Sequence, residues 1–219
     1  MVTLTHLTKR FNKGGQGIAA LNDVSLTLAA GTWTTITGKS GSGKSTLLYV
    51  IAGLLKPTSG TVVVDGEDVP RLSGAGRAAF RGRKIGFIFQ SFHLFPHLTV
   101  LQNVLMSGGR FGADASAAQK LLERLDLSDR AGHYPSELSV GEKQRVAIGR
   151  AVLCRPALIL ADEATGNLDR ENGDAVIHYL RGFKAEGMSV VFVTHKAREE
   201  FQAFTDQFII LDKGRRVNV

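Results

Sequence analysis

The sequence predicts an α/β protein with a mainly parallel sheet, an N-terminal antiparallel β portion and a helical insert. Two continuous apolar segments, 157–161 and 189–193, are typical of strands buried on both faces, as in parallel sheets covered by helices. Near the N-terminus, apolar and polar residues alternate, which is typical of half-exposed strands. The stretch from 91 to 154 has apolar residues at helical spacing, so we expect it to be all-helical.

The elements of the first 90 residues follow from local patterns. Alternating segments at 2–7 and 24–28 predict two strands, and the glycine-rich segment 13–17 between them predicts a hairpin turn or a flexible loop. Apolar residues at helical spacing predict a helix over 45–55, which ends before Pro57 because the residue before a proline disfavours helical conformation. Further strands are predicted at 32–37, 61–64 and 85–89.

The rest of the chain contains helix signals first and strand signals afterwards. Thr99, followed three residues later by Gln102, fits a capping box and predicts a helix that begins there. A second helix is predicted by an apolar stripe that consists of Ala118, Leu121, Leu122 and Leu125. Strand patterns return at 157–161, 189–193 and 208–211, and 216–219 is a further candidate strand.

These elements predict a single domain over residues 1–219. We expect 1–90 and 155–219 to form an α/β core and 91–154 to form a helical subdomain. The 219 residues suffice for one large hydrophobic core, and 43% apolar with 21% charged residues is ordinary for a soluble globular protein. No apolar run approaches the roughly 20 residues that a membrane helix needs.

Charge and cysteine content indicate where the protein works. The N-terminus lacks the layout of a signal peptide, and Cys154 is the only cysteine, so no internal disulfide forms. The net charge of +7 is compatible with nucleic acid, anionic lipid or phosphate ligands. The basic clusters contain no interleaved aromatic residues that could stack on bases. We therefore expect a protein of the reducing cytoplasm that does not bind nucleic acid, and a basic face near a membrane surface is an open alternative.

Residues 38–45 read Gly-Lys-Ser-Gly-Ser-Gly-Lys-Ser and match G-x-x-x-x-G-K-[ST] between a predicted strand and a predicted helix. Glycines let backbone N–H groups turn toward phosphate oxygens, and the helix N-terminus adds positive potential. Lys44 is expected to reach the β- and γ-phosphates, and Ser45 to bind Mg²⁺. The pattern predicts a P-loop NTPase core whose phosphate-binding residues are Gly38, Lys39, Ser40, Gly41, Ser42, Gly43, Lys44, Ser45 and Thr46.

Two adjacent carboxylates, Asp162 and Glu163, follow the apolar strand at 158–161. In a parallel sheet, the carboxyl end of this strand lies beside the phosphate-binding loop. Asp162 is expected to hold Mg²⁺, and Glu163 to act as the general base for the attacking water.

Residues 138–145, Leu-Ser-Val-Gly-Glu-Lys-Gln-Arg, resemble the LSGGQ signature of the ABC-transporter ATPase family and the helix that follows it. The residues themselves agree, because Ser139 and Glu142 fit a capping box at the start of a helix. The helix N-terminus, the Ser139 hydroxyl and the Gly141 backbone make a second expected anion site. In the family, this site binds the γ-phosphate of an ATP molecule held by the partner subunit.

Further segments match the family pattern in order, and the resemblance covers essentially the whole chain. It implies that Gln90, after a strand, is the glutamine that touches Mg²⁺ and the attacking water and senses the permease. Asp169 lies in a segment, 166–169, that is similar to the D-loop at the dimer interface. His195 resembles the switch histidine that contacts the γ-phosphate, and Phe11 the aromatic residue that stacks on adenine. The catalytic set implied is Glu163, His195, Lys44 and Gln90, with Ser45, Gln90 and Asp162 around the metal.

The chain departs from the family pattern at three positions that bear on the site. Val140 and Glu142 stand where the signature has glycine and glutamine, and the branched Val140 is expected to tighten the local geometry. Ala164 stands where the family usually has proline, which is expected to loosen the D-loop without removing a chemical group.

Segments 85–96 and 165–169 resemble those of lipoprotein-release, macrolide-export and cell-division ATPases. The resemblance implies a subunit that hydrolyses ATP, with Mg²⁺, and drives a force-transmitting membrane permease through ATP-dependent dimerisation of two copies. It also implies a peripheral position on the cytoplasmic face of a bacterial inner membrane.

Three alternatives remain open at this point. The chain could serve an importer of amino acids or metals, since only the permease distinguishes these. A DNA-repair ATPase shares the head motifs, but the compact connection from Ser45 to Ser139 has no heptad array and no cysteine pairs. The intact Glu163 and His195 speak against a regulatory subunit that binds ATP without hydrolysing it.

Overall fold

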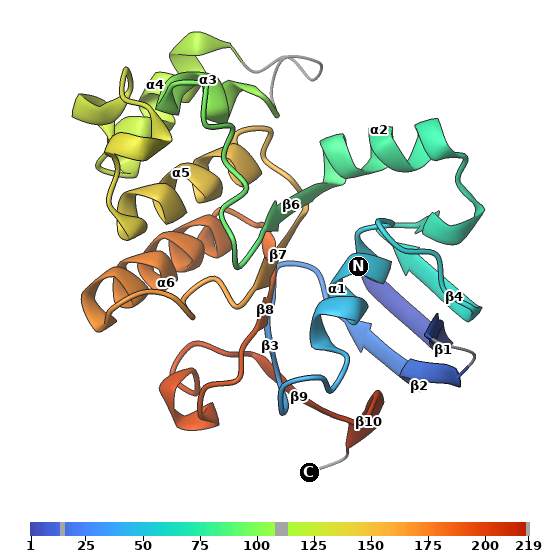
Figure 1. The fold of residues 1–219 in the computed structure, drawn as a ribbon. Coiled ribbons are helices and arrows are strands. Elements are labelled where there is room, and N and C mark those ends of the chain that lie inside the picture. The colour runs from blue at the N-terminus through green and yellow to red at the C-terminus, as the bar shows by residue number, and fades with distance from the viewer. Residues whose placement is uncertain (14–15, 108–113, 218–219) are drawn as a thin grey trace.

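The computed structural model describes residues 1–13, 16–107 and 114–217. Two sheets and a group of helices make up the fold (Figure 1). The central sheet has six strands, the N-terminal sheet has four, and the helices of the middle region lie on the opposite side of the central sheet from the N-terminal sheet. No helix of the described parts is long and apolar enough to cross a membrane.

The N-terminal sheet is antiparallel and has the strand order β2-β1-β4-β5. The predicted strands at 2–7 and 24–28 are confirmed as the outer parts of one long hairpin, in which Lys13 pairs with Gln16. Residues 14 and 15 of the predicted turn lie outside the described residues. The strands are β1 (Val2–Lys13), β2 (Gln16–Leu28), β4 (Ser59–Val64) and β5 (Glu67–Asp68).

The central sheet has the order β10-β9-β3-β8-β7-β6, with parallel pairing throughout except between β9 and β10. The predicted mainly parallel sheet is therefore confirmed. Of the predicted last strand, residues 218 and 219 lie outside the described residues. The strands are β3 (Trp33–Thr37), β6 (Ile85–Ile88), β7 (Leu158–Asp162), β8 (Ser189–Val193), β9 (Gln207–Asp212) and β10 (Arg215–Val217).

Side chains of the central strands alternate between two hydrophobic cores, which explains their continuous apolar sequences. In β7, Leu158 and Leu160 face α1 and the N-terminal sheet, whereas Ile159 and Ala161 face the helices on the other side. All five residues of β7 and of β8 are buried. Because both faces of the sheet are covered, only the strand ends remain for polar chemistry.

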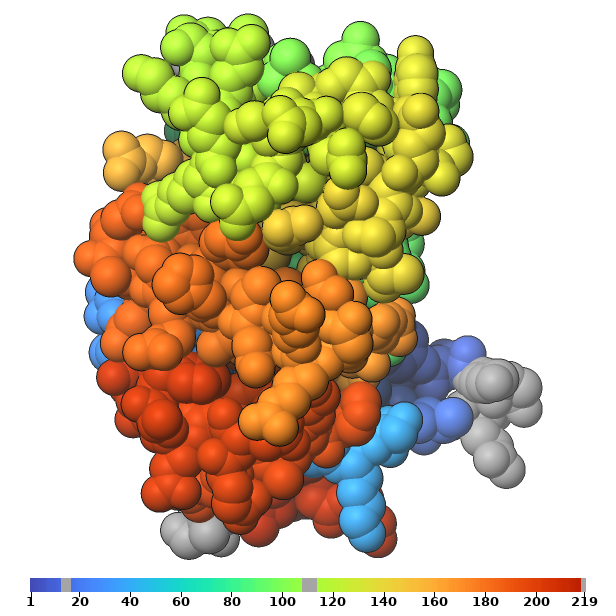
Figure 2. Space-filling model, turned by 90° about the vertical axis from the view of Figure 1, so that its left-hand side faces the viewer, coloured from blue at the N-terminus to red at the C-terminus, as the bar shows by residue number. Residues whose placement is uncertain are grey.

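In the described parts of the middle region the regular secondary structure is helical, as predicted, and loops connect the helices. The capping box at Thr99 and Gln102 is present, and Leu125 of the predicted stripe lies just beyond its helix. Figure 2 shows this region, in green to yellow, above α6 and the C-terminal segments, in orange to red. Its helices are α3 (Val100–Leu105), α4 (Ala115–Arg124) and α5 (Val140–Val152), with the short 3₁₀ turns η2 (Ser128–Arg130) and η3 (Pro135–Glu137).

The remaining helices correct the sequence-based prediction in two ways. Helix α1 ends at Ile51, before the predicted residue 55, and Gly53 then adopts a left-handed conformation with φ +66° that terminates it. Helices α2 and α6 were not predicted. In α2, Phe80 is the only buried residue, and the other positions show no apolar stripe. These elements are α1 (Lys44–Ile51), α2 (Gly74–Lys84), α6 (Arg170–Ala185), η1 (Val69–Arg71) and η4 (Arg198–Glu200).

Candidate active site

The predicted phosphate-binding loop connects β3 to α1 and is shaped by glycines. Gly38 and Gly43 have φ values of +154° and +102°. A Cβ at Gly38 would collide with the carbonyl oxygen of Leu211, and one at Gly43 with that of Ala20. The loop therefore lies against the backbone of β2 and β9, where no residue with a side chain fits.

Lys44, the first residue of α1, spans this loop. Its side chain is buried, and Nζ donates to the carbonyl oxygens of Gly38 and Lys39 at 2.8 and 3.1 Å. The first turn of α1 contains no acidic residue, so nothing there neutralises the positive end of the helix dipole. An ammonium group, a helix N-terminus and a glycine-shaped loop thus meet in one place, which suits the phosphates of a nucleotide.

Ser45 and Asp162 meet beside the loop. The Ser45 hydroxyl donates to Oδ1 of Asp162 at 2.9 Å, although 117 positions separate them in sequence. Burial raises the pKa of the Asp162 carboxyl, and the hydrogen bond from Ser45 opposes this rise. The described residues contain no group of three or more His, Cys, Asp or Glu side chains able to hold a metal. A hydroxyl and a carboxylate fit Mg²⁺, which keeps several waters and takes few protein ligands beside phosphates.

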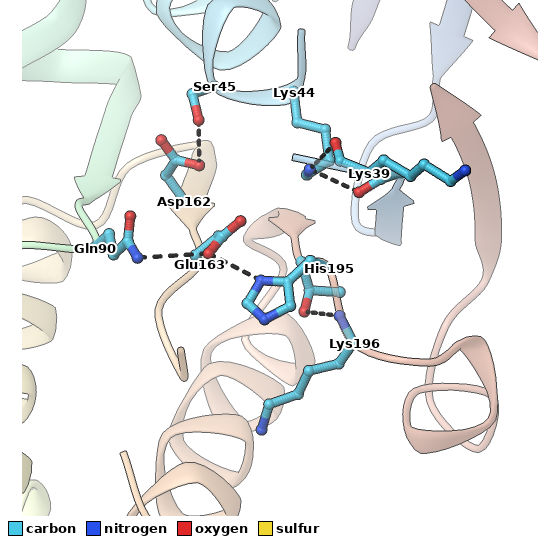
Figure 3. A network of polar contacts seen from close by, with 10 residues as sticks. Lys39, Lys44, Ser45, Gln90, Asp162, Glu163, His195 and Lys196 are labelled. Carbon is cyan, nitrogen blue, oxygen red and sulfur yellow. Dashed lines mark hydrogen bonds and ion pairs between the residues drawn. The ribbon is translucent and has the colours of Figure 1, made fainter. Parts of the chain in front are cut away.

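Two further predicted residues, His195 and Gln90, converge on one carboxylate oxygen of a third, Glu163 (Figure 3). Oε2 of Glu163 lies 3.0 Å from Nδ1 of His195 and 3.5 Å from Nε2 of Gln90. The three residues follow the neighbouring parallel strands β7, β8 and β6. Glu163 has a φ of +48°, a conformation uncommon for residues with a side chain, and its N–H donates to Val193 O at 3.0 Å. The backbone is thus held in a strained conformation where the predicted base lies.

The predicted signature residues lie at the start of α5. Ser139 caps the helix, and its hydroxyl accepts from the Glu142 N–H at 3.2 Å while Oε2 of Glu142 accepts from the Ser139 N–H at 2.7 Å. The capping box is therefore confirmed. Gly141 is buried against Asn172 of α6, and Asn172 in turn is bound by Asp169, the N-cap of that helix.

Stability should depend on pH through Glu142. Hydrogen bonds from Ser139 and from Arg130 Nε, at 2.9 Å, lower the pKa of this carboxyl to about 2. Because the pKa is lower in the folded state, the ionised carboxylate stabilises the fold above the pKa of an unfolded glutamate, about 4.3. This contribution is lost as the pH falls through about 4 toward 2. Glu142→Gln should lower the free energy of unfolding by about 1 kcal/mol at pH 7, and the loss should be smaller at pH 3.

Urea unfolding of the wild type and of Glu142→Gln at several pH values measures this difference. Glu123→Gln, which removes an exposed carboxylate from α4, is the matched control. Equal stability of Glu142→Gln and the wild type at pH 7 would contradict a stabilising role for the carboxylate.

The structure brings the predicted residues together in two groups. The P-loop, Asp162, Glu163, Gln90 and His195 form the first group, at the carboxyl ends of the central strands. The second consists of Ser139, Gly141 and Asp169, and within the described parts of the chain no hydrogen bond joins it to the first.

Phe11 belongs to neither group. It lies on β1, paired in register with Ile18, and 38% of its surface is exposed. Lys9 Nζ lies 5.0 Å from the centre of its ring. The ring is thus accessible to a ligand.

Two residues that contact the site regions were missed in the sequence. Asn172 contacts Asp169 and Gly141, and Arg150 of α5 donates to the carbonyl oxygens of Phe92 and His93, which follow Gln90. The position of Asn172, three residues after an N-cap aspartate, was the only local signal for it.

Val140 and Ala164, two of the three departures from the family pattern, occupy different surroundings. Val140 is exposed at the first position of α5, so its side chain faces outward beside Ser139. Ala164 is buried in the core and lies within a turn that is closed by the Gly166 N–H and the Glu163 carbonyl oxygen at 2.9 Å.

Comparisons with known proteins agree with this geometry. The family model described as ABC transporter matches residues 21–166. The lipoprotein-releasing system ATP-binding protein LolD of Shewanella frigidimarina is 44% identical over 200 residues, which cover 89% of this chain and 84% of that protein. The macrolide export ATP-binding/permease protein MacB of Burkholderia pseudomallei is 42% identical over 99% of this chain, which spans 34% of that longer protein.

A solved structure is similar over the whole chain. It is described as the dimeric post-hydrolysis state of the ATP-binding cassette MJ0796 bound to ADP and Pi. The TM-score is 0.91 and the identity 37%, with coverage of 100% of this chain and 97% of the other. The matches to LolD and MacB confirm the predicted resemblance to lipoprotein-release and macrolide-export proteins. On its motifs, its fold and these matches, the chain belongs to the ABC-transporter ATPase family.

Proposed function

We propose that this chain binds and hydrolyses ATP as one half of a head-to-tail dimer that drives a membrane permease. The observation that carries the proposal is the separation of two anion-binding groups within one chain. The P-loop lies at the strand ends. The exposed Ser139 lies at the start of α5 and makes no hydrogen bond to the P-loop. A second copy would place its Ser139 and Gly141 against the phosphate that the first copy binds. The dimeric cassette among the similar structures supports this arrangement.

In this proposal the residues of the first group, together with Phe11, divide the binding and the chemistry of ATP between them. Lys44 binds the β- and γ-phosphates, while Phe11 stacks on the adenine ring. Ser45, Asp162 and Gln90 would hold Mg²⁺, which would supply positive charge to the phosphates. Glu163 would accept a proton from the attacking water, and His195 and Gln90 would orient this carboxylate. His195 would also contact the γ-phosphate, and Gln90 the attacking water. The shared oxygen of Glu163 supports this assignment, since both partners already contact it.

A permease is proposed as the second partner. A cavity of about 470 Å³ lies between β6 and the helical region, and much of its lining is aromatic or aliphatic. Residues 91–154 would act as the helical subdomain, with 1–90 and 155–219 as the catalytic core. The cavity would accept an apolar segment of a permease at the cytoplasmic face of a membrane. Its lining includes Phe87, Phe89, Phe95, Met106, Arg150 and Cys154.

The relatives favour one type of transporter over the alternatives. Their names refer to lipoprotein release and macrolide export, and MacB carries its permease in the same chain. We therefore infer an outward or force-transmitting system rather than an importer or a DNA-repair ATPase.

The dimer predicts that ATP hydrolysis depends on protein concentration. If each site needs residues of two chains, the rate per chain should rise with concentration until the dimer saturates. Phosphate release by the purified chain, measured over a hundredfold range of concentration, tests this. EDTA should abolish the rate at every protein concentration, because it removes the Mg²⁺ that Ser45 and Asp162 would hold against the phosphates.

A rate strictly proportional to concentration would contradict a shared site. If no hydrolysis occurs, the same series is repeated with a permease in vesicles, and continued absence would contradict the ATPase assignment.

A further inference from the structure

Asn172 joins the two segments that the proposed dimer needs from one chain. It lies in the first turn of α6, and its backbone N–H donates to Oδ1 of Asp169 at 2.8 Å. Its side-chain nitrogen donates to both oxygens of the same carboxylate, at 2.9 and 3.0 Å. Hydrogen bonds to charged groups are stronger than neutral ones, so the Asn172 side chain is held in one orientation.

In that orientation, the oxygen of the Asn172 amide points toward α5, the helix that begins with the signature residues. Because the nitrogen faces Asp169, the oxygen Oδ1 faces Gly141 of α5. A Cβ built on Gly141 would overlap this oxygen, so only glycine fits there. Gly141 has no positive φ, and therefore its backbone conformation does not require glycine. Alanine favours helices more than glycine does, so the contact with Asn172 accounts for the glycine.

We propose that Asn172 is a positioning residue. It fixes the position of the start of α5, with its exposed Ser139, relative to Asp169 at the start of α6. Both ends then meet a second copy of the chain as one rigid unit. The inference rests on the proposed dimer, and it assigns a role to a residue that touches neither nucleotide nor metal.

The first test measures dimer formation apart from nucleotide binding. Asn172→Asp keeps the shape of the side chain but removes the donor and places a second carboxylate beside Asp169. In a Glu163→Gln background with ATP and Mg²⁺, it should weaken the dimer about tenfold in sedimentation experiments. The affinity of the monomer for ATP should change less than twofold, since the P-loop is untouched. Glu171→Gln, an exposed neighbour in the same helical turn, should leave the dimer constant unchanged.

The second test uses thermal stability and needs neither nucleotide nor dimer. Gly141→Ala should lower the Tm by about 2–8 °C, because the new Cβ displaces the Asn172 amide. In an Asn172→Ala background the space is open, so Gly141→Ala should then raise the Tm, as helix propensity predicts.

The outcomes separate this inference from the proposed function. If the Glu163→Gln chain forms no dimer with ATP, the proposed function fails, and the thermal test still decides the Asn172–Gly141 contact. If the dimer forms equally well with Asn172→Asp, the positioning role is wrong. An equal Tm change of Gly141→Ala in both backgrounds also overturns it.

Discussion

Glu163→Gln should lower the rate of ATP hydrolysis about 10²- to 10⁴-fold, the usual loss when a general base is removed. Glutamine keeps the length of the side chain and one acceptor oxygen, so His195 and Gln90 retain a partner near 3.0 and 3.5 Å. Only the ability to accept a proton from water is lost. Phosphate release by matched preparations at saturating ATP measures the effect.

The same substitution should stabilise the dimer. If hydrolysis removes the phosphate that joins the P-loop of one chain to Ser139 of the other, blocking hydrolysis leaves that link in place. Glu163→Gln should therefore dimerise with ATP and not with ADP, while wild-type protein dimerises only briefly. Glu171→Gln, which removes an exposed carboxylate, is the control. A wild-type rate for Glu163→Gln would show that another group activates the water.

Much of this site could be predicted because its residues end strands. Asp162 ends β7, and Glu163, Gln90 and His195 follow parallel strands that lie side by side. An apolar run that stops at a polar residue is visible in the sequence, and parallel pairing then brings such ends to one edge. Ser45 and Asp162, which the sequence predicts to hold the same Mg²⁺ ion, are 2.9 Å apart in the structure.

Other features depend on contacts that no local pattern encodes. The close approach of Asn172 to Gly141 arises from packing of α5 on α6. The positive φ of Glu163 accompanies a hydrogen bond to the neighbouring strand β8. Helix α2 lacks an apolar stripe because it buries only Phe80. Sequence periodicity detects buried faces, and it misses elements that bury little or that meet through single side chains.

Lys44→Met should raise the dissociation constant for ATP about 10- to 100-fold, which corresponds to the roughly 1.5–3 kcal/mol of a hydrogen bond to a charged group. Methionine nearly matches the length of the lysine side chain and its aliphatic stem, but it has no charge. The loss also leaves the carbonyl oxygens of Gly38 and Lys39 without their donor, so a small loss of stability is expected as well. Equilibrium binding of a fluorescent ATP analogue measures the affinity, and Lys56→Met, at an exposed position beyond α1, is the control.

Lys44→Arg separates the effect of charge from that of shape. The ammonium group lies in a buried position between two carbonyl oxygens of a loop in which Gly38 and Gly43 already exclude any side chain. A guanidinium is planar and wider, so it cannot take the same place without moving the loop. We expect Lys44→Arg to bind ATP almost as poorly as Lys44→Met, even though the charge is kept. Wild-type affinity in Lys44→Arg would mean that long-range attraction is sufficient, and the close contacts around Lys44 would then have no part in holding the phosphates.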